Sequence, residues 1–216
     1  MKPQGRVWFF DLDGTLYDPR QGLWPAVGAR IEAYLQQTLG LSPAAARALR
    51  RRYVQQYGTT LHGLRAEHPD LDPHDYLRFV GQVPVEALVR PDPRLRAVLA
   101  TLPGPKWIFT NGDAPYARRV LRTLGVEDLF DGIIDIVRLN FVGKPYPAAY
   151  ARALRLARGV SPAAALLVDD SRGHVEAARR AGWQAVWVHP EVRAPQPGVI
   201  PHIYALPQGL PQENTP

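Results

Sequence analysis

Short apolar runs recur along the chain, and they are apolar at successive positions rather than at alternate ones. The five clearest runs cover residues 7–10, 106–109, 133–137, 166–168 and 185–188. Strands that are buried on both faces have this pattern, because helices cover both sides of a parallel sheet. The pattern therefore predicts five parallel strands, and we expect a further short strand near residues 203–206.

Helical periodicity fills most of the intervals between these runs, with apolar residues at i, i+3 and i+4 over 91–102, 114–124, 147–158 and 172–181. Asp113 and Ser171 precede two of the helices and are expected N-caps, while Gly125, Gly159 and Gly182 follow three of them as stop signals. Strands that alternate with helices of this length predict a doubly wound, Rossmann-like α/β sheet. Such a sheet binds its ligands at the carboxyl ends of its strands.

Residues 18–88 interrupt this alternation, because they contain no good strand but show helical patterns over 24–39, 43–57 and 73–80. A βαβ unit needs only about 30 residues. We therefore expect an α/β core of residues 1–17 and 89–216, with residues 18–88 inserted as a helical cap. Trp24 and Tyr53 are expected in the cap core or its interface. Thr59 and Thr60 either face a substrate or belong to a turn after Gly58.

Polar side chains follow three of the predicted strands, and a lysine precedes a helix: Asp11 and Asp13, Thr110 and Asn111, Asp169 and Asp170, and Lys144. In a parallel sheet these groups converge on one edge. Clustered carboxylates repel one another unless a hard cation lies among them, and oxygen ligands without cysteine or paired histidine favour Mg²⁺ over zinc. The lysine, hydroxyl and amide offer donors to an anion. This combination predicts phosphoryl transfer, with a carboxylate able to attack phosphorus.

Each of these groups has a simpler structural interpretation when it is taken alone. An Asp-x-Asp turn often only connects a strand to a helix, and the pair Asp169 and Asp170 could serve in capping. The coincidence of all the groups at strand ends favours a functional site.

The segments Asp11-Leu-Asp-Gly-Thr-Leu16, Thr110-Asn111, Lys144-Pro145 and Asp169-Asp170 resemble, in this order, the four motifs of the haloacid dehalogenase-like hydrolase superfamily. The inserted lobe resembles the small helical cap of that superfamily. Residues 9–17 and 57–64 are similar to the pyrimidine 5′-nucleotidase-like branch.

The resemblance implies a role for each matching residue. Asp11 would be the nucleophile and a metal ligand. Asp13 would protonate the leaving oxygen and then activate water, with its main-chain carbonyl contacting Mg²⁺. The remaining residues would hold the phosphoryl group (Thr110, Asn111, Lys144) or complete the metal site, directly or through water (Asp169, Asp170). The residue at 174, often an amide in related sequences, is histidine here.

The expected function is that of a Mg²⁺-dependent phosphomonoester hydrolase that works through an aspartyl-phosphate, with pyrimidine nucleoside monophosphates as candidate substrates. A sugar phosphomutase of the same fold and a non-catalytic phosphate-binding scaffold remain alternatives. A dehalogenase is disfavoured, because carbon–halogen hydrolysis has no leaving alkoxide for Asp13 to protonate. A response-regulator receiver is disfavoured by the inserted lobe and by the aspartate on the first strand.

Composition restricts the expected partners. The 26 lysines and arginines outnumber the 20 aspartates and glutamates, giving a net charge of +6, but the basic residues are scattered rather than gathered in a stripe. We therefore expect a small phosphorylated substrate and no nucleic acid. No apolar run approaches the length of a membrane span, so we expect no membrane contact. The absence of cysteine suits a cytoplasmic protein, and the sequence leaves the oligomeric state open.

Overall fold

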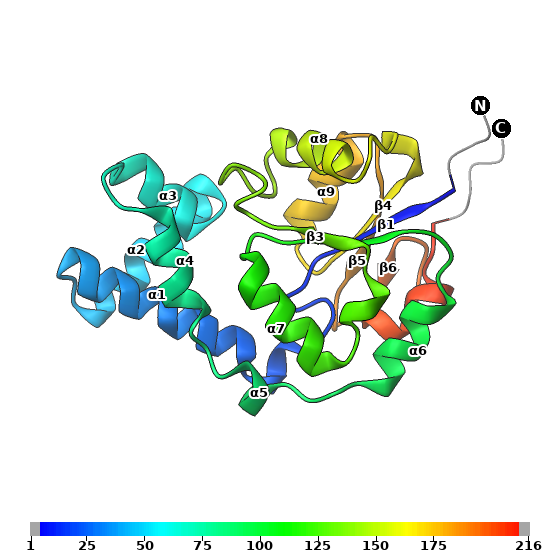
Figure 1. Cartoon of the computed structure of the whole chain (residues 1–216), viewed down its shortest axis with the longest axis horizontal. Helices are drawn as coiled ribbons and strands as arrows, with labels where there is room; N and C mark the ends of the chain where they lie inside the picture. Colours follow the sequence, from blue (N-terminus) through cyan, green and yellow to red (C-terminus); the bar gives the residue numbers. More distant parts are fainter. Residues whose placement is uncertain (1–4, 212–216) are drawn as a thin grey trace.

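Six parallel strands form one sheet in the order β3-β2-β1-β4-β5-β6 in the computed structural model, which describes residues 5–211. The strands are β1 (Val7–Phe10), β2 (Lys106–Phe109), β3 (Gly132–Ile134), β4 (Ala165–Asp169), β5 (Gln184–Val188) and β6 (Val199–Ile200). Helices cover both faces of this sheet (Figure 1). The predicted doubly wound α/β fold is confirmed.

The central strand β1 supplies core residues to both sides of the sheet. Trp8 and Phe10 belong to one hydrophobic cluster, and Val7 and Phe9 belong to the other. All four side chains are buried. This explains why the strand is apolar at every position, since neither face meets water.

Four helices of the core flank the sheet in two layers (Figure 1). Residues of α6 (Pro93–Thr101) and α7 (Ala114–Leu124) pack in the cluster of Trp8 and Phe10. Residues of α8 (Pro147–Leu156) and α9 (Arg172–Arg180) pack in the cluster of Val7 and Phe9. The predicted boundaries of these helices agree with the structure to within two residues.

Most of the segment between β1 and β2 is helical: η1 (Pro19–Gln21), α1 (Leu23–Leu39), α2 (Pro43–Tyr57), α3 (Thr60–Glu67), α4 (Pro73–Gly81) and α5 (Val85–Leu88). The helices α1 to α4 lie together beside the sheet (Figure 1). Gly40 ends α1 with a φ of 65°, and Ser42 begins α2 by accepting a hydrogen bond from the Ala45 N–H.

Helix α3 was not predicted, because its eight residues are short for periodicity to reveal. The hydroxyl of Thr59 accepts a hydrogen bond from the His62 N–H and caps this helix. A Cβ on Gly63 would lie 2.3 Å from the ring of Tyr53, so glycine allows α3 to pack closely on the fully buried Tyr53. Tyr53 is therefore buried where α2 and α3 pack together.

The predicted strand at 203–206 is wrong. The last strand is β6, which pairs with β5, and Pro201 follows it without an N–H to continue the ladder. Residues Ile203–Gln208 form a 3₁₀ helix, η4. Ile203 and Leu206 are buried in it. Their spacing of three matches the three residues per turn of this helix.

Two other local predictions are also corrected. Strand β3 ends at Ile134 because the buried carboxylate of Asp135 accepts hydrogen bonds from the N–H groups of Ala114 and Arg138, which starts a turn. Asp113 caps α7 as predicted, but the hydroxyl of Ser171 makes no capping hydrogen bond to α9.

The remaining turns and helices are consistent with the predicted stop signals. Gly125, Gly159 and Gly182 all have positive φ angles. Two short 3₁₀ segments, η2 (Glu127–Leu129) and η3 (Pro162–Ala164), precede β3 and β4. Across residues 5–211, no helix combines the length and apolar character required to cross a membrane.

Candidate active site

A cavity of about 350 Å³ lies where the carboxyl ends of the strands face the helices α1, α2, α3 and α4. Five of the seven predicted site residues line it: Asp11, Asp13, Thr110, Asn111 and Asp170. The other two, Lys144 and Asp169, are fully buried and contact the residues that line it. The structure therefore brings all seven residues to one end of a single cavity.

Lys144 lies between two carboxylates beneath the cavity floor. Its Nζ donates hydrogen bonds to Oδ1 of Asp11 at 2.8 Å and to Oδ2 of Asp169 at 2.5 Å. Asp11 follows β1 and Asp169 ends β4, so adjacent strands place them on either side of the ammonium group. A buried ammonium requires this pairing, since an isolated charge in the protein interior is very costly.

The charges of this group perturb one another strongly. Burial raises the pKa of Asp11, and the ammonium of Lys144 opposes that rise. Burial also acts to raise the pKa of Asp169, but Lys144 and His174 outweigh it and hold that pKa below its usual range. Burial acts to lower the pKa of Lys144, whereas Asp11 and Asp169 raise it above its ordinary value. Lys144 therefore stays charged at neutral pH.

The carboxylate of Asp13 is held by two tyrosines that the sequence did not single out. Tyr17 and Tyr116 donate hydrogen bonds to the same oxygen, Oδ1, at 2.5 and 2.6 Å. Burial and the nearby Asp11 raise the pKa of Asp13 to about 6, and the two hydrogen bonds limit the rise. A carboxyl with this pKa can exchange a proton near neutral pH, as general acid–base catalysis requires.

The side chain of Asn111 binds the main chain of Lys144. Its Oδ1 accepts from the Lys144 N–H at 2.8 Å, and its Nδ2 donates to the Lys144 carbonyl at 2.9 Å. A Cβ on Gly143 would lie 2.2 Å from that Oδ1, so only glycine permits the approach. The predicted contact between Asn111 and a phosphoryl group therefore competes with a positioning role toward Lys144.

The hydroxyl of Thr110, which the resemblance assigns to the phosphoryl group, accepts a hydrogen bond from the Gly112 N–H at 3.0 Å. This contact follows β2 and helps to shape the loop that leads into α7. Because a hydroxyl also carries a donor proton, Thr110 can still donate to an anion in the cavity.

Asp170 is tied to the turn after β1. Thr15 donates through its hydroxyl to Oδ1 of Asp170 at 3.3 Å and accepts from the Asp170 N–H at 3.1 Å. Gly14 has a φ of 81°, and a Cβ on it would lie 2.6 Å from Oδ2 of Asp170. Burial, together with Asp11 and Asp169, raises the pKa of Asp170. The turn therefore holds a carboxylate that like charges destabilise.

His174 also belongs to this group. Its Nδ1 lies 3.0 and 3.1 Å from the two carboxylate oxygens of Asp169, and its ring lines the cavity. Asp169 additionally accepts from the Ser171 N–H at 2.8 Å. Asp169 is therefore surrounded by donors, which favours a role in positioning Lys144.

The carboxylates suit a hard divalent cation. One oxygen each from Asp11, Asp169 and Asp170 can be chosen so that all lie within 4.8 Å of one another. These donors are all oxygens, and like-charge repulsion among them is what a cation would relieve. Asp13, whose predicted contact is through its main-chain carbonyl, contributes no carboxylate to this group. The residues therefore fit Mg²⁺.

The far end of the cavity is lined by the helices α1 to α4 and is mostly apolar. Trp24 is 44% exposed and lines the cavity that the strand ends share with the helices α1 to α4, so of the two expected places it lies at the interface of the helical segment and not in its core. Thr59 and Thr60 both line the cavity as well, and Thr59 is also the cap of α3. Both interpretations of this pair therefore have support.

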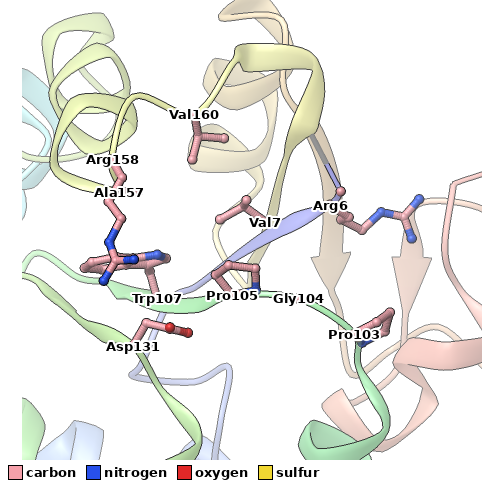
Figure 2. A pocket seen from close by; sticks show the side chains of 11 residues that line it. Arg6, Val7, Pro103, Gly104, Pro105, Trp107, Asp131, Ala157, Arg158 and Val160 are labelled. Atoms are coloured by element: carbon pink, nitrogen blue, oxygen red, sulfur yellow. The ribbon is translucent and has the colours of Figure 1, made fainter. Parts of the chain in front are cut away.

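A second cavity, of about 380 Å³, lies at the opposite end of the sheet, near the starts of β1 and β2. Figure 2 shows that Trp107, Asp131 and Arg158 gather on one side of it, with Pro103 and Pro105 across from Val160. None of the seven predicted site residues lines it. The chemistry predicted from the sequence is therefore confined to the first cavity.

The model of the haloacid dehalogenase-like hydrolase family matches residues 6–182, which include every predicted site residue. Relatives by sequence agree. Phosphate metabolism protein 8 of Saccharomyces cerevisiae is 30% identical over 194 residues, covering 83% of this chain but only 60% of the yeast protein. A phosphoglycolate phosphatase of Neisseria gonorrhoeae is 32% identical over 190 residues, covering 83% of this chain and 78% of that protein.

Solved structures show the same fold. The L-2-haloacid dehalogenase from Xanthobacter autotrophicus with chloropropionic acid covalently bound is similar with a TM-score of 0.60 and 20% identity, over 95% of this chain and 98% of that one. At this identity the similarity concerns the fold alone.

Proposed function

The chain belongs to the haloacid dehalogenase-like hydrolase family, and we propose that it is a Mg²⁺-dependent phosphomonoester hydrolase that works through an aspartyl-phosphate on Asp11. The observation that carries the proposal is the convergence of carboxylates, a buried lysine and a threonine hydroxyl at one end of the cavity. Named phosphatases among the sequence relatives support it. A phosphoryl group needs neutralised charge on one side and a nucleophile on the other, and this end of the cavity offers both.

In the proposed reaction an oxygen of Asp11 attacks phosphorus while Asp13 gives its proton to the leaving oxygen. Tyr17 and Tyr116 both donate to Oδ1 of Asp13, and residues 5–211 donate no hydrogen bond to Oδ2, so Oδ2 is left to carry that proton toward the substrate. Asp13 then takes a proton from the water that attacks the phosphorylated Asp11, releasing phosphate and restoring both carboxyl groups.

Lys144 and Thr110 supply positive charge and a hydroxyl donor at the phosphoryl end, and Asn111 fixes the main chain of Lys144. Asp11, Asp169 and Asp170 would hold Mg²⁺, together with the main-chain carbonyl of Asp13. The cation neutralises phosphoryl charge when bound. The buried ammonium of Lys144 opposes the rise that burial causes in the pKa of Asp11, and it therefore favours the nucleophilic carboxylate form.

Residues 18–88 are proposed to act as a cap that covers the site and contacts the leaving group. Their helices line the end of the cavity that faces away from the carboxylates. We propose pyrimidine nucleoside monophosphates as substrates, on the similarity of residues 9–17 and 57–64 to the nucleotidase-like branch.

The test is hydrolysis of a panel of phosphomonoesters with Mg²⁺ present, scored by kcat/KM and by release of phosphate. Turnover of an aryl phosphate with phosphate as the product supports the hydrolase. Conversion of a sugar phosphate to its isomer without free phosphate would indicate the phosphomutase alternative. No reaction with any phosphomonoester would indicate the non-catalytic scaffold.

A further inference from the structure

One cationic side chain reaches the apolar end of the active-site cavity. Among the described residues of α1 to α4 that line the cavity, Arg50 alone is charged. Its neighbours there include Val27 and Ile31 of α1 and Leu77 and Val80 of α4. An isolated guanidinium among aliphatic side chains is costly unless it meets an acceptor.

Arg50 is held in place by a glycine and a glutamate of α1. A Cβ on Gly28 would lie 2.7 Å from Nη1 and 2.9 Å from Nη2, so the guanidinium lies directly against the helix backbone. Glycine inside a helix costs about 1 kcal/mol relative to alanine. Gly28 is an interior residue of α1, and the absence of a side chain there makes room for the guanidinium of Arg50.

Glu32 neutralises this arginine on one side only. Nη1 of Arg50 donates to Oε1 of Glu32 at 3.1 Å. Within residues 5–211, Nη2 and Nε of Arg50 donate no hydrogen bond. The pair therefore offers N–H donors to the cavity without a net charge. Such donors suit a neutral carbonyl, whereas an added carboxylate would leave one uncompensated negative charge in an apolar space.

The same cavity is also lined by two large apolar side chains that are exposed to water. Among residues 5–211, the large hydrophobic side chains that are exposed are Trp24, at 44%, and Val54, at 48%. Both line this cavity. An apolar group bound between them would remove both surfaces from water.

We propose that Arg50 is a specificity-determining residue that selects a leaving group whose far end is an uncharged ring or chain that carries a hydrogen-bond acceptor for the guanidinium. This inference rests on the proposed phosphomonoester hydrolase function and deepens it. It separates this chain from its phosphoglycolate phosphatase relatives, because the glycolate leaving group is small and carries a carboxylate.

The test compares kcat/KM for benzyl phosphate, its 4-acetyl derivative, its 4-carboxy derivative and phosphoglycolate. The methylene group insulates the leaving oxygen from the ring substituent, so differences report binding rather than intrinsic reactivity. The unmodified protein should prefer the 4-acetyl derivative over benzyl phosphate by about five- to tenfold, the amount expected for one hydrogen bond. The 4-carboxy derivative and phosphoglycolate should be poorer than both.

Three variants test how Arg50 contributes to the choice of substrate. Arg50→Gln should lose the preference for the acetyl group and leave benzyl phosphate within about threefold. Gly28→Ala should do the same, because the new Cβ displaces the guanidinium while alanine favours the helix. Glu32→Gln should improve the 4-carboxy derivative, since it leaves the charge of Arg50 uncompensated.

Two matched controls accompany them. Arg51→Gln changes an exposed arginine next to Arg50 on α2, and Gly173→Ala adds a Cβ to a helical glycine whose nearest neighbour would be the Ser171 hydroxyl at 3.9 Å. Neither should alter the substrate ranking.

The outcomes distinguish a failure of the Arg50 proposal from a failure of the proposed hydrolase function. Turnover of benzyl phosphate without a preference for the acetyl group, or equal losses on every substrate in Arg50→Gln, would overturn the role of Arg50 alone. A preference for phosphoglycolate would also overturn it. Absence of turnover with all four substrates would overturn the hydrolase function and this inference with it.

Discussion

Tyr116 donates a hydrogen bond of 2.6 Å to Oδ1 of Asp13, although the two residues are 103 positions apart in the sequence. Tyr17 donates to the same oxygen from four residues away. One contact comes from α7 and the other from the segment that leads into the cap. The orientation of the proposed acid–base carboxyl therefore depends on both α7 and the segment between β1 and η1.

Tyr116→Phe tests that dependence through the pH profile. Asp13 must be protonated to donate to a leaving oxygen, so kcat/KM for an alkyl phosphate should fall as the pH rises through about 6. The hydrogen bond from Tyr116 lowers the pKa of Asp13. Its removal should therefore raise that pKa and move the falling limb to higher pH.

Tyr204→Phe is the matched control for this profile. The Tyr204 hydroxyl donates at 2.5 Å to Asp92, the cap of α6, and neither residue lines the cavity. This variant should keep the profile of the unmodified protein. An unmoved limb in Tyr116→Phe would show that Asp13 does not control the pH dependence.

Lys144→Met should destabilise the fold as well as abolish activity. The change leaves Asp11 and Asp169 buried without their shared cation, and breaking such a buried pair costs about 3–5 kcal/mol. With the ammonium gone, the folded-state pKa values of both carboxyls rise above their unfolded values. The penalty should therefore be largest at neutral pH and shrink as falling pH protonates them.

Denaturant unfolding at several pH values measures this penalty. Lys106→Met, at an exposed ammonium that donates to the Gly104 carbonyl, is the control and should change stability little. A Lys144→Met protein as stable as the control at neutral pH would contradict the claim that Lys144 is the shared buried partner of Asp11 and Asp169.

Removal of divalent cations should abolish hydrolysis. Oxygens of Asp11, Asp169 and Asp170 within 4.8 Å of one another repel strongly without a cation, and a chelator should lower turnover of an aryl phosphate to background. Added Mg²⁺ should restore it. Full turnover in chelator-treated, metal-free buffer would rule out the metal-dependent mechanism.

Asp11→Asn should lower kcat by a factor on the order of 10³ or more, because an amide cannot act as the nucleophile. The side chain keeps its shape, and Lys144 keeps Asp169 as a partner, so the variant should remain folded. Circular dichroism confirms the fold, and steady-state assay gives the rate. Near-normal turnover by a folded variant would exclude Asp11 as the nucleophile.

The parts of the fold that the sequence predicted well are those determined by local pattern. Continuous apolar runs identified β1 and β2 to the residue, and the polar groups after the strands identified the family and the class of hydrolase, which the family model confirms. The wrong strand near the C-terminus has the same origin, because an apolar spacing of three suits a 3₁₀ helix as well as an irregular strand.

The unpredicted features depend on tertiary packing. Nothing in the local sequence links Tyr116 to Asp13, and the side chain of Arg50 meets Gly28 only because α1 and α2 pack together. Tryptophan is large and apolar, so the sequence favours a buried position for Trp24. The packing of the helices α1 to α4 instead leaves it exposed along the cavity. Contacts of this kind follow from the positions of whole elements rather than from periodicity.

The central claim is that Asp11 carries the phosphoryl group during turnover. The most direct measurement is acid quenching of the protein during hydrolysis of an aryl phosphate, followed by peptide mass spectrometry. We expect a hydroxylamine-sensitive phosphoryl group on the peptide that contains Asp11, and none in Asp11→Asn. Steady turnover with no phosphorylated peptide under a quench that preserves acyl phosphates, or with the phosphoryl group on another residue, would contradict the account.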